Sequence, residues 1–509
     1  MPPNERQSRA EARRRAIAAS LTLGLLAAAF IGRAVISIDG AEVVSVSLGL
    51  FVTGRFEAAM LPSADLLPVP AFHSHYGLFP SLLPVPSLAV AWPLRAFLGG
   101  PGLDGFVALT WAAGALLAAI AFHRLASVFR EGLSPLFVPA FLGGTFLWPY
   151  AADSFFDPFS AAAFAFAAQR VLRERESRPS DFFVASVLWS AGCWLRPILW
   201  VTAPVFLLAA LLRVRERSLG SRVALGAFFG LGAGLAVALA VNTVYQGSPF
   251  HFGYVLSSEL PFWHPLGAGL YGLLLSPGRG LVFFAPVVLL APFGLRRRRA
   301  AAWVLALGAP AVLALVIARW FVWNGGSCWG PRYLLAVLPL LAAPAVLAPA
   351  GLLRAAFALG ALLNLPGVLV APGAFISYAE RLAPPPGIAW PPHGPDRVSE
   401  VAALSPLYGH VWLFANGLVP SSLPAPWLHA GAKETAPRPG LGDFVSPLLV
   451  RRALGLPPIP PFSPRLLSRT AAAYAVRGRP REARLFAGEA LALDPNDALA
   501  REVVSATPP

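Results

Sequence analysis

The sequence predicts an all-helical protein that crosses a membrane many times, and two observations carry this prediction. The first is composition: of 509 residues, 56% are hydrophobic and 13% are charged, whereas a soluble domain has roughly 25% charged residues. The second is order: apolar runs recur between Ala16 and Ala371, with short arginine clusters between them. A run of about 20 apolar residues spans the hydrocarbon core of a bilayer.

The net charge of +15 does not indicate a nucleic-acid-binding protein, because the basic residues form no single stripe. They stand at the ends of apolar runs, as the positive-inside rule of membrane proteins requires. Cys193 and Cys328 are the two cysteines, too few for a disulfide framework or a four-ligand zinc site. We therefore expect no nucleic-acid partner.

The positions of the first predicted elements follow from the arginines near the N-terminus and from the prolines of the second apolar stretch. Arginines before residue 16 place the N-terminus in the cytoplasm, so an uncleaved first span is expected over residues 16–36 and an outer loop over 38–78. The apolar stretch 79–98 contains four prolines. Proline removes helical hydrogen bonds that lipid cannot replace, so we expect this stretch to be interfacial or re-entrant.

The later spans are expected at residues 105–123, 135–151, 157–172, 182–196, 198–212, 223–243, 280–295, 300–322, 332–349 and 353–371. This assignment leaves most arginine clusters in inner loops. If the stretch 79–98 also spanned, nearly all of those clusters would lie outside. The charge rule therefore favours about eleven spans, with the N-terminus inside and the C-terminus outside.

Residues 1–371 thus form the predicted transmembrane domain. Residues 372–464 are rich in proline and glycine and are expected to be an extended outer segment. Residues 465–509 contain the spacing of one tetratricopeptide unit, with a plain alanine-rich helical hairpin as the alternative. One such unit cannot bury its own face, so we expect it to pack on the membrane domain or on a protein partner.

Two carboxylates come directly after the first span. Asp39 and Glu42 are three residues apart, which places them on one face of a helix. An ionisable group at a membrane edge is a functional candidate, and a carboxylate there can serve as a general base. The alternative is that Asp39 caps a helix that begins near Ala41.

Two arginines stand in glycine-rich outer turns, against the positive-inside trend. Arg279 lies in SPGRG (276–280), and Arg332 lies in WNGGSCWGPRY (323–333), which we call the glycine-rich loop. Arginine suits phosphate because its donors form a fixed, permanently charged fork. We predict a lipid-phosphate site here, with Arg55 and Arg196 as further candidates. The alternative is that these arginines reach lipid headgroups.

Asp157 precedes a proline that opens a span, so helix capping is the alternative to a role in substrate binding. His73 and His75 would need a third ligand to hold a divalent metal. We therefore expect no cofactor, with a metal site as the weaker alternative.

Five strings together match a known pattern, and they lie at residues 37–56, 75–83, 245–254, 276–280 and 329–333. On these strings, residues 16–371 resemble the polytopic, lipid-carrier-dependent glycosyltransferases of the C-type fold, near the protein mannosyltransferases and aminoarabinose transferases. The resemblance implies an inverting transfer from a polyprenyl-phosphate sugar at the outer face of a bacterial inner membrane. The acceptor would be a glycan, a lipid or a protein.

The resemblance also implies roles for single residues. Asp39 matches the acidic first-loop base of the family, and the substrate-contacting positions would be His75, Tyr76, Asp157, Tyr254 and Tyr333. The chain departs from the family where relatives often have an adjacent Asp-Glu pair. Here Gly40 follows Asp39, so Glu42 is the other candidate base and lost activity is an alternative.

The sequence is also compatible with two functions of other classes. A transporter or flippase for a lipid-linked precursor often shows inverted repeats, and we find no repeat. A non-catalytic membrane scaffold would present the C-terminal unit to a partner, and it would not need Asp39.

Overall fold

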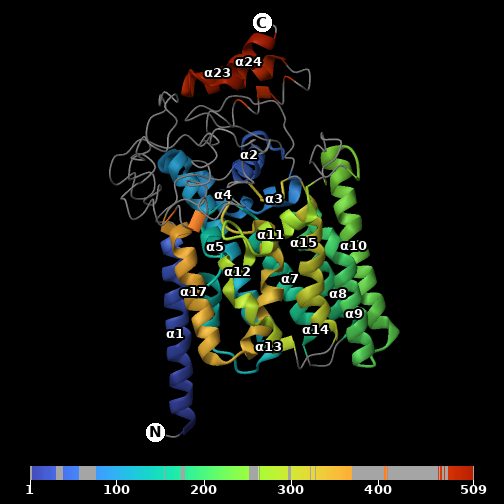
Figure 1. The fold of residues 1–509 in the computed structure, drawn as a ribbon. Coiled ribbons are helices and arrows are strands. Elements are labelled where there is room, and N and C mark those ends of the chain that lie inside the picture. The colour runs from blue at the N-terminus through green and yellow to red at the C-terminus, as the bar shows by residue number, and fades with distance from the viewer. Residues whose placement is uncertain are drawn as a thin grey trace.

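A computed structural model describes residues 3–29, 38–56, 76–153, 155–173, 178–250, 262, 264–295, 300–320, 322–326, 328–369, 406–407, 410, 468, 471–472, 475 and 480–507. Every regular element in these ranges is a helix, so the predicted all-helical class is confirmed for this part of the chain. Figure 1 shows a bundle with the N-terminus at one end and the C-terminus at the other.

The first half of the chain contains α1 (Pro3–Ala29), α2 (Ile38–Thr53), α3 (Leu78–Leu82), α4 (Val85–Ala91), α5 (Arg95–Phe129), α6 (Phe137–Gly143), α7 (Asp157–Leu172), α8 (Pro179–Leu195), α9 (Ala203–Glu216) and α10 (Ser221–Gln246). Short 3-10 helices η1 (Trp92–Leu94), η2 (Pro149–Ala151) and η3 (Pro197–Thr202) lie between them.

The second half contains α11 (Leu266–Leu274), α12 (Leu281–Phe284), α13 (Ala291–Leu295), α14 (Ala300–Trp303), α15 (Ala309–Arg319), α16 (Leu338–Ala342), α17 (Ala350–Leu369), α23 (Pro480–Leu493) and α24 (Ala498–Ala506). The 3-10 helices here are η4 (Pro286–Leu290), η6 (Arg332–Val337) and η7 (Ala343–Leu347), and η5 (Val304–Gly308) is a π-helical turn between α14 and α15.

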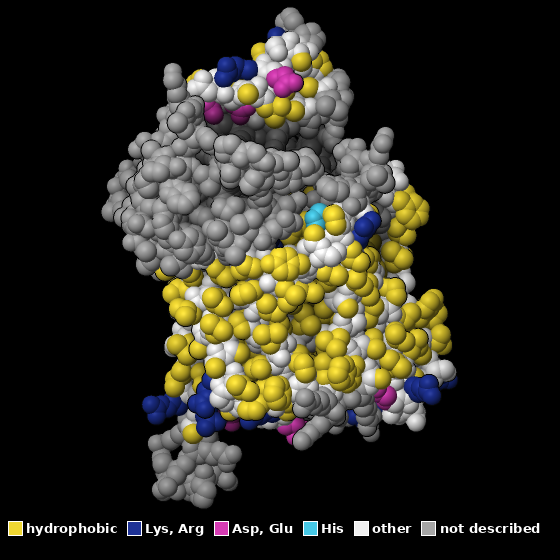
Figure 2. Space-filling model, in the orientation of Figure 1, with side chains coloured by type: hydrophobic (Ala, Val, Ile, Leu, Met, Phe, Trp, Pro, Cys, Tyr) yellow, Lys and Arg dark blue, Asp and Glu magenta, His cyan; other side chains and the backbone are white. Residues whose placement is uncertain are grey.

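Five helical stretches of the described chain are long and apolar enough to cross a membrane: Phe106–Phe129, Pro197–Glu216, Ser221–Gln246, Ala300–Arg319 and Ala350–Leu369. Figure 2 shows the matching surface, a broad hydrophobic band with Lys and Arg side chains along its lower edge. The prediction of apolar helices long enough to span a membrane is confirmed for these five stretches, whereas a count of about eleven spans stays a prediction.

The proline-rich stretch after Tyr76 forms short helices. α3 ends at Leu82 and α4 ends at Ala91, and together with η1 they make an apolar stretch shorter than the five candidate spans. Figure 1 shows α2, α3 and α4 near the end of the bundle that faces away from the N-terminus. The prolines account for these breaks, because each removes a backbone donor from the helical ladder.

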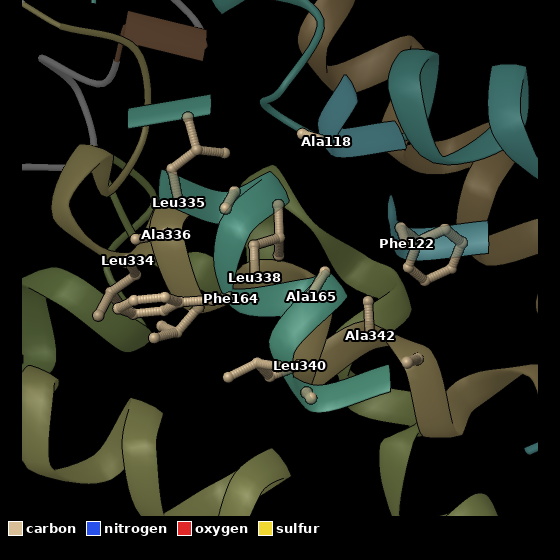
Figure 3. Close-up of a cluster of buried hydrophobic side chains, with 14 of the residues drawn as sticks. Ala118, Phe122, Phe164, Ala165, Leu334, Leu335, Ala336, Leu338, Leu340 and Ala342 are labelled. Atoms are coloured by element: carbon tan, nitrogen blue, oxygen red, sulfur yellow. The ribbon is translucent and has the colours of Figure 1, made fainter. Parts of the chain in front are cut away.

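The core of the bundle lies around α7. Side chains from α5, from α7 and from the stretch of η6 and α16 gather in one buried cluster, shown in Figure 3 with Ala118, Phe122, Phe164, Ala165, Leu334, Leu335, Ala336, Leu338, Leu340 and Ala342 labelled. This packing anchors the chain that follows the glycine-rich loop.

Helices α8 and α10 pack closely because glycines on α10 leave room for the backbone of α8. A Cβ atom added at Gly226 would lie 2.6 Å from the Pro179 carbonyl oxygen, and one at Gly230 would lie 2.7 Å from the Phe183 carbonyl oxygen. Small residues spaced by four are a common way for membrane helices to approach each other. α10 then ends at Gly247, whose φ of 79° terminates the helix.

The C-terminal region forms a helical hairpin of α23 and α24. Its small core consists of Ala471, Ala483, Ala487, Ala490, Ala500 and Val503. The Asp497 side chain caps α24 by accepting a hydrogen bond from the Ala500 N–H at 2.9 Å. Of the predicted outer segment 372–464, the structure describes residues 406, 407 and 410.

Candidate functional site

A buried ion pair joins the start of α7 to the start of η3. The Arg196 Nε atom lies 2.8 Å from Asp157 Oδ1, and Arg196 Nη2 donates to Asp157 Oδ2 at 2.9 Å. Both side chains are buried, with 1% and 0% exposed. The capping interpretation of Asp157 is wrong, because α7 has no side-chain cap. Its carboxylate instead neutralises a guanidinium that would be costly to bury alone.

The ion pair places Arg196 against the end of the glycine-rich loop. The Arg196 Cζ atom lies 4.8 Å from the ring centroid of Phe156 and 5.0 Å from that of Tyr333. Arg332, itself buried, has its Cζ atom 4.3 Å from the Phe155 ring and 5.1 Å from the Tyr333 ring. Two guanidinium groups therefore share the Tyr333 ring in cation–π geometry.

Arg279 has a different environment, because its donors meet the backbone of the glycine-rich loop. It is fully buried. Nη1 donates to the carbonyl oxygen of Asn324 and, at 3.0 Å, to Cys328 Sγ, while Nη2 donates to the carbonyl oxygen of Gly326. These contacts favour a role in shaping the loop over direct contact with a phosphate.

Two consecutive glycines give the loop the shape that Arg279 holds. Gly325 and Gly326 have φ values of 74° and 75°, a left-handed conformation that residues with a Cβ atom rarely adopt. The Asn324 side chain supports the same turn, since its Oδ1 accepts a hydrogen bond from the Gly326 N–H at 2.8 Å. The sequence pattern of WNGG thus corresponds to a defined backbone turn.

Trp329 ties the loop to three other parts of the chain. Its carbonyl oxygen accepts a hydrogen bond from the Tyr150 hydroxyl at 2.8 Å. Its indole N–H donates to Asn364 Oδ1 at 2.8 Å, and Asn364 Nδ2 donates to the Phe284 carbonyl oxygen at 2.9 Å. Tyr150 and Asn364 are not among the predicted site residues. A buried amide in the apolar helix α17 is the signal that would have indicated Asn364.

Buried charges of both signs surround Tyr150. Arg332, Asp153 and Asp157 all lie close enough to interact electrostatically with its hydroxyl, and all three are buried. With Arg196 and Arg279, the described residues of this region supply three buried arginines and two buried aspartates. The cluster therefore has a surplus of positive charge, which suits an anionic ligand.

Helix α2, which contains the predicted base, packs near this cluster. Val43 and Val44 of α2 share a hydrophobic cluster with Tyr76, Phe156 and Leu195, and Phe156 and Leu195 are the chain neighbours of the two ion-pair residues. The Tyr76 and Phe156 rings are 5.6 Å apart in an edge-to-face arrangement. Val43 and Val44 of α2 thus connect this helix to the ion pair through packed side chains.

Asp39 lies in the first turn of α2, one turn before Val43, because the helix begins at Ile38. The expected helix start near Ala41, on which a simple capping role depended, is therefore wrong. The side chains of Asp39 and Glu42 lie outside the described residues, as do His73, His75 and Tyr254 in full. Their predicted roles stay predictions.

Arg55 stands apart from the expected base along the same helix. It is exposed and follows the end of α2 at Thr53, so about 20 Å of helix separates it from Asp39 at 1.5 Å per residue. Among the described residues, no group of three or more His, Cys, Asp and Glu side chains is placed to hold a metal ion. Arg196, Asp157, Tyr76, Arg332 and Tyr333 are the predicted site residues that the structure brings together.

Comparison of the chain with protein families, with curated proteins and with solved structures finds no match.

Proposed function

We propose that the chain transfers a sugar from a polyprenyl-phosphate donor to an acceptor at the outer face of a bacterial inner membrane. One observation supports this most. Predicted site residues from separate segments, Tyr76, Asp157, Arg196, Arg332 and Tyr333, meet in one connected cluster. The region around this cluster holds three buried arginines against two buried aspartates, and helix α2 carries the expected base in its first turn.

In the proposed reaction, the acceptor hydroxyl oxygen attacks the anomeric carbon of the donor sugar. The bond from that carbon to the phosphate oxygen breaks, polyprenyl phosphate leaves, and the configuration at the carbon inverts. Asp39 takes the proton of the acceptor hydroxyl, with Glu42 as the second candidate. The acceptor is a glycan, a lipid or a protein.

Arg332 is our candidate for contact with the phosphate, where a fixed guanidinium stabilises the charge that develops on the leaving oxygen. Arg279 holds the backbone of the glycine-rich loop, and the pair of Asp157 and Arg196 supports the Tyr333 ring from another side. In this proposal these three residues position Arg332 and Tyr333, and Tyr76 lines the approach from α2.

The membrane topology is part of the proposal: about eleven spans, with the N-terminus in the cytoplasm and the C-terminus outside. Figure 1 supports opposite ends for the two termini. Cysteine labelling in whole cells checks the orientation. Residues 215 and 297 should be protected from an impermeant reagent, and residue 509 should react. A protected C-terminus would overturn the proposed topology.

The test of function uses the full chain in detergent and undecaprenyl phosphate, the carrier released by such a reaction, as the probe. Arg332→Lys should weaken binding about ten-fold, equivalent to about 1.4 kcal/mol, because lysine keeps the charge and loses the fork of donors. Arg95→Lys is the matched control, since Arg95 also stacks on an aromatic ring, 4.7 Å from Trp92, but is exposed.

Unchanged affinity in both Arg332→Lys and Arg332→Ala would remove Arg332 from the donor site. A second measurement separates the enzyme from a transporter: proteoliposomes that contain the protein are given a polyprenyl-phosphate hexose and a mixture of acceptors. Sugar released from the carrier onto an acceptor supports the transferase. Movement of the intact lipid between leaflets without release supports a flippase.

A further inference from the structure

A histidine from the chain after α17 lies against the glycine-rich loop. His410 is completely buried, and its ring centroid lies 4.8 Å from that of Trp329, with 74° between the ring planes. Nearby Leu407 packs on the main hydrophobic core. These residues belong to the stretch that the sequence predicts to be an extended outer segment, so part of that stretch contacts the candidate site.

The proton position on this histidine follows from its partner. His410 Nδ1 lies 2.9 Å from the Pro406 carbonyl oxygen. A carbonyl oxygen can only accept, so Nδ1 carries the hydrogen and donates it. This bond fixes the plane of the imidazole, and the fixed plane presents the ring to Trp329 in edge-to-face geometry.

The other tryptophan of the glycine-rich loop has a similar partner. His264 is buried, its Nδ1 lies 3.0 Å from the Ala318 carbonyl oxygen, and its ring centroid is 5.3 Å from that of Trp323. Two histidines, each held by a backbone carbonyl through Nδ1, therefore contact the two tryptophans of the loop. His264 comes from the segment before α11, whereas His410 comes from beyond α17.

The position of Trp329 matters because it precedes the residue proposed to bind phosphate. After Trp329 the chain turns at Gly330, with a φ of 62°, and reaches Arg332 two residues later. The Trp329 carbonyl and indole are held by Tyr150 and Asn364. The contact with His410 is a further restraint on the same side chain, and it comes from a distant part of the sequence.

We propose that His410 is a positioning residue of the glycine-rich loop and thereby belongs to the candidate site. The positioning of the loop does not depend on the reaction. The consequence for ligand binding rests on the proposed function, in which Arg332 contacts the phosphate of the donor. The two parts can be tested separately.

Cys328 offers a reporter for the loop, because it is the neighbour of Trp329 and is buried. The chain has two cysteines, so Cys193→Ala leaves Cys328 as the single thiol. In the full-length protein in detergent, the rate at which a maleimide alkylates Cys328 then measures how often the loop opens. Circular dichroism and thermal unfolding of each variant exclude a general loss of structure.

In this background His410→Ala should raise the alkylation rate roughly two- to ten-fold, the factor that corresponds to loss of one aromatic pair. His410→Phe keeps a ring against Trp329 and should restore a rate close to that of the parent. His123→Ala on α5 is the matched control. The His123 Nε2 atom also lies near a backbone carbonyl oxygen, 3.2 Å from that of Leu133. Equal rates in His410→Ala and the parent would overturn the proposal.

The second arm measures the dissociation constant of undecaprenyl phosphate for the same variants. His410→Ala should weaken binding, because a displaced Trp329 no longer holds the backbone that leads to Arg332, and His410→Phe should recover it. Faster alkylation with unchanged affinity would overturn the assignment of His410 to the ligand site. If the parent protein does not bind this probe, the proposed function fails, and the alkylation rates still decide whether His410 holds the loop.

Discussion

The carboxylate of Asp157 and the guanidinium of Arg196 lie side by side in the interior, with contacts of 2.8 and 2.9 Å. Removing one partner of such a pair leaves a buried charge without compensation, which typically costs about 3–5 kcal/mol. We therefore expect Asp157→Asn to lower the free energy of unfolding by about that amount. Reversible unfolding in mixed detergent micelles measures the change.

A double variant, Asp157→Leu with Arg196→Met, serves as the control for the same pair. It removes both charges, so its cost should be smaller than the sum of the two single changes. Additive costs would mean that the two side chains act independently and that the ion pair does not stabilise the fold.

Asp39→Asn should lower sugar transfer by about 10²–10⁴-fold, because the amide keeps the size of the carboxylate but cannot take a proton. Binding of undecaprenyl phosphate should be retained. Turnover in detergent with a fixed donor and acceptor checks this result. Transfer within a few-fold of the parent would remove Asp39 as the base, and Glu42→Gln would then be measured in the same assay.

Gly230→Ala should destabilise the contact of α8 and α10 by about 1–3 kcal/mol, since there is no room for an added methyl group. A Cβ at this position would lie 2.7 Å from both the Phe183 carbonyl oxygen and Ser186 Cβ. Gly232→Ala lies in the same helix with nothing within 4 Å. That variant should be neutral or stabilise the protein by up to about 1 kcal/mol, as thermal unfolding in detergent will show.

Asp181 at the start of α8 should make stability depend on acid pH. Burial opposes ionisation, but hydrogen bonds from the Arg178 backbone N–H and from the Arg173 side chain outweigh it, so the pKa of Asp181 is lowered from its usual value of 3.8. A lowered pKa means that the stabilisation is present above pH 3.8 and is lost as the pH falls through the folded-state pKa.

The matching variant is Asp181→Ala, which removes both the cap on the Arg178 N–H at 3.0 Å and the ion pair with Arg173. We expect it to cost about 1 kcal/mol at neutral pH. The difference between this variant and the parent should shrink as the pH is lowered below 3.8. A difference that stays constant over this range would show that the carboxylate charge contributes nothing.

Helix positions were predictable where local composition decides them. The expected span 157–172 coincides with α7 (Asp157–Leu172), and 223–243 lies within α10 (Ser221–Gln246), because both are apolar runs bounded by proline, glycine or arginine. The expected span 135–151 instead splits into α6 and η2, since glycines and a proline interrupt it. Helix α11 was not predicted, because its nine residues are too few to form an apolar run of membrane-spanning length.

The candidate site was predictable only for residues with a local signal. Arg332 and Tyr333 stood out because they end a glycine-rich string. The partner of Asp157 is 39 residues away, and no local pattern reveals a contact at that separation, so the carboxylate resembled a helix cap. His410 was hidden for the same reason, since its partner Trp329 lies in a different region of the chain.

The Arg279 contacts also have a consequence for the order in which the chain folds during synthesis. Its partners, the carbonyl oxygens of Asn324 and Gly326 and the Sγ atom of Cys328, lie 45 to 49 residues further along the chain. A ribosome must therefore deliver the whole of α12 to α15 before the guanidinium finds its acceptors. Until then this arginine lacks the loop acceptors that help it to be buried, so the guanidinium and the glycine-rich loop reach their final arrangement only after residue 328 has been made.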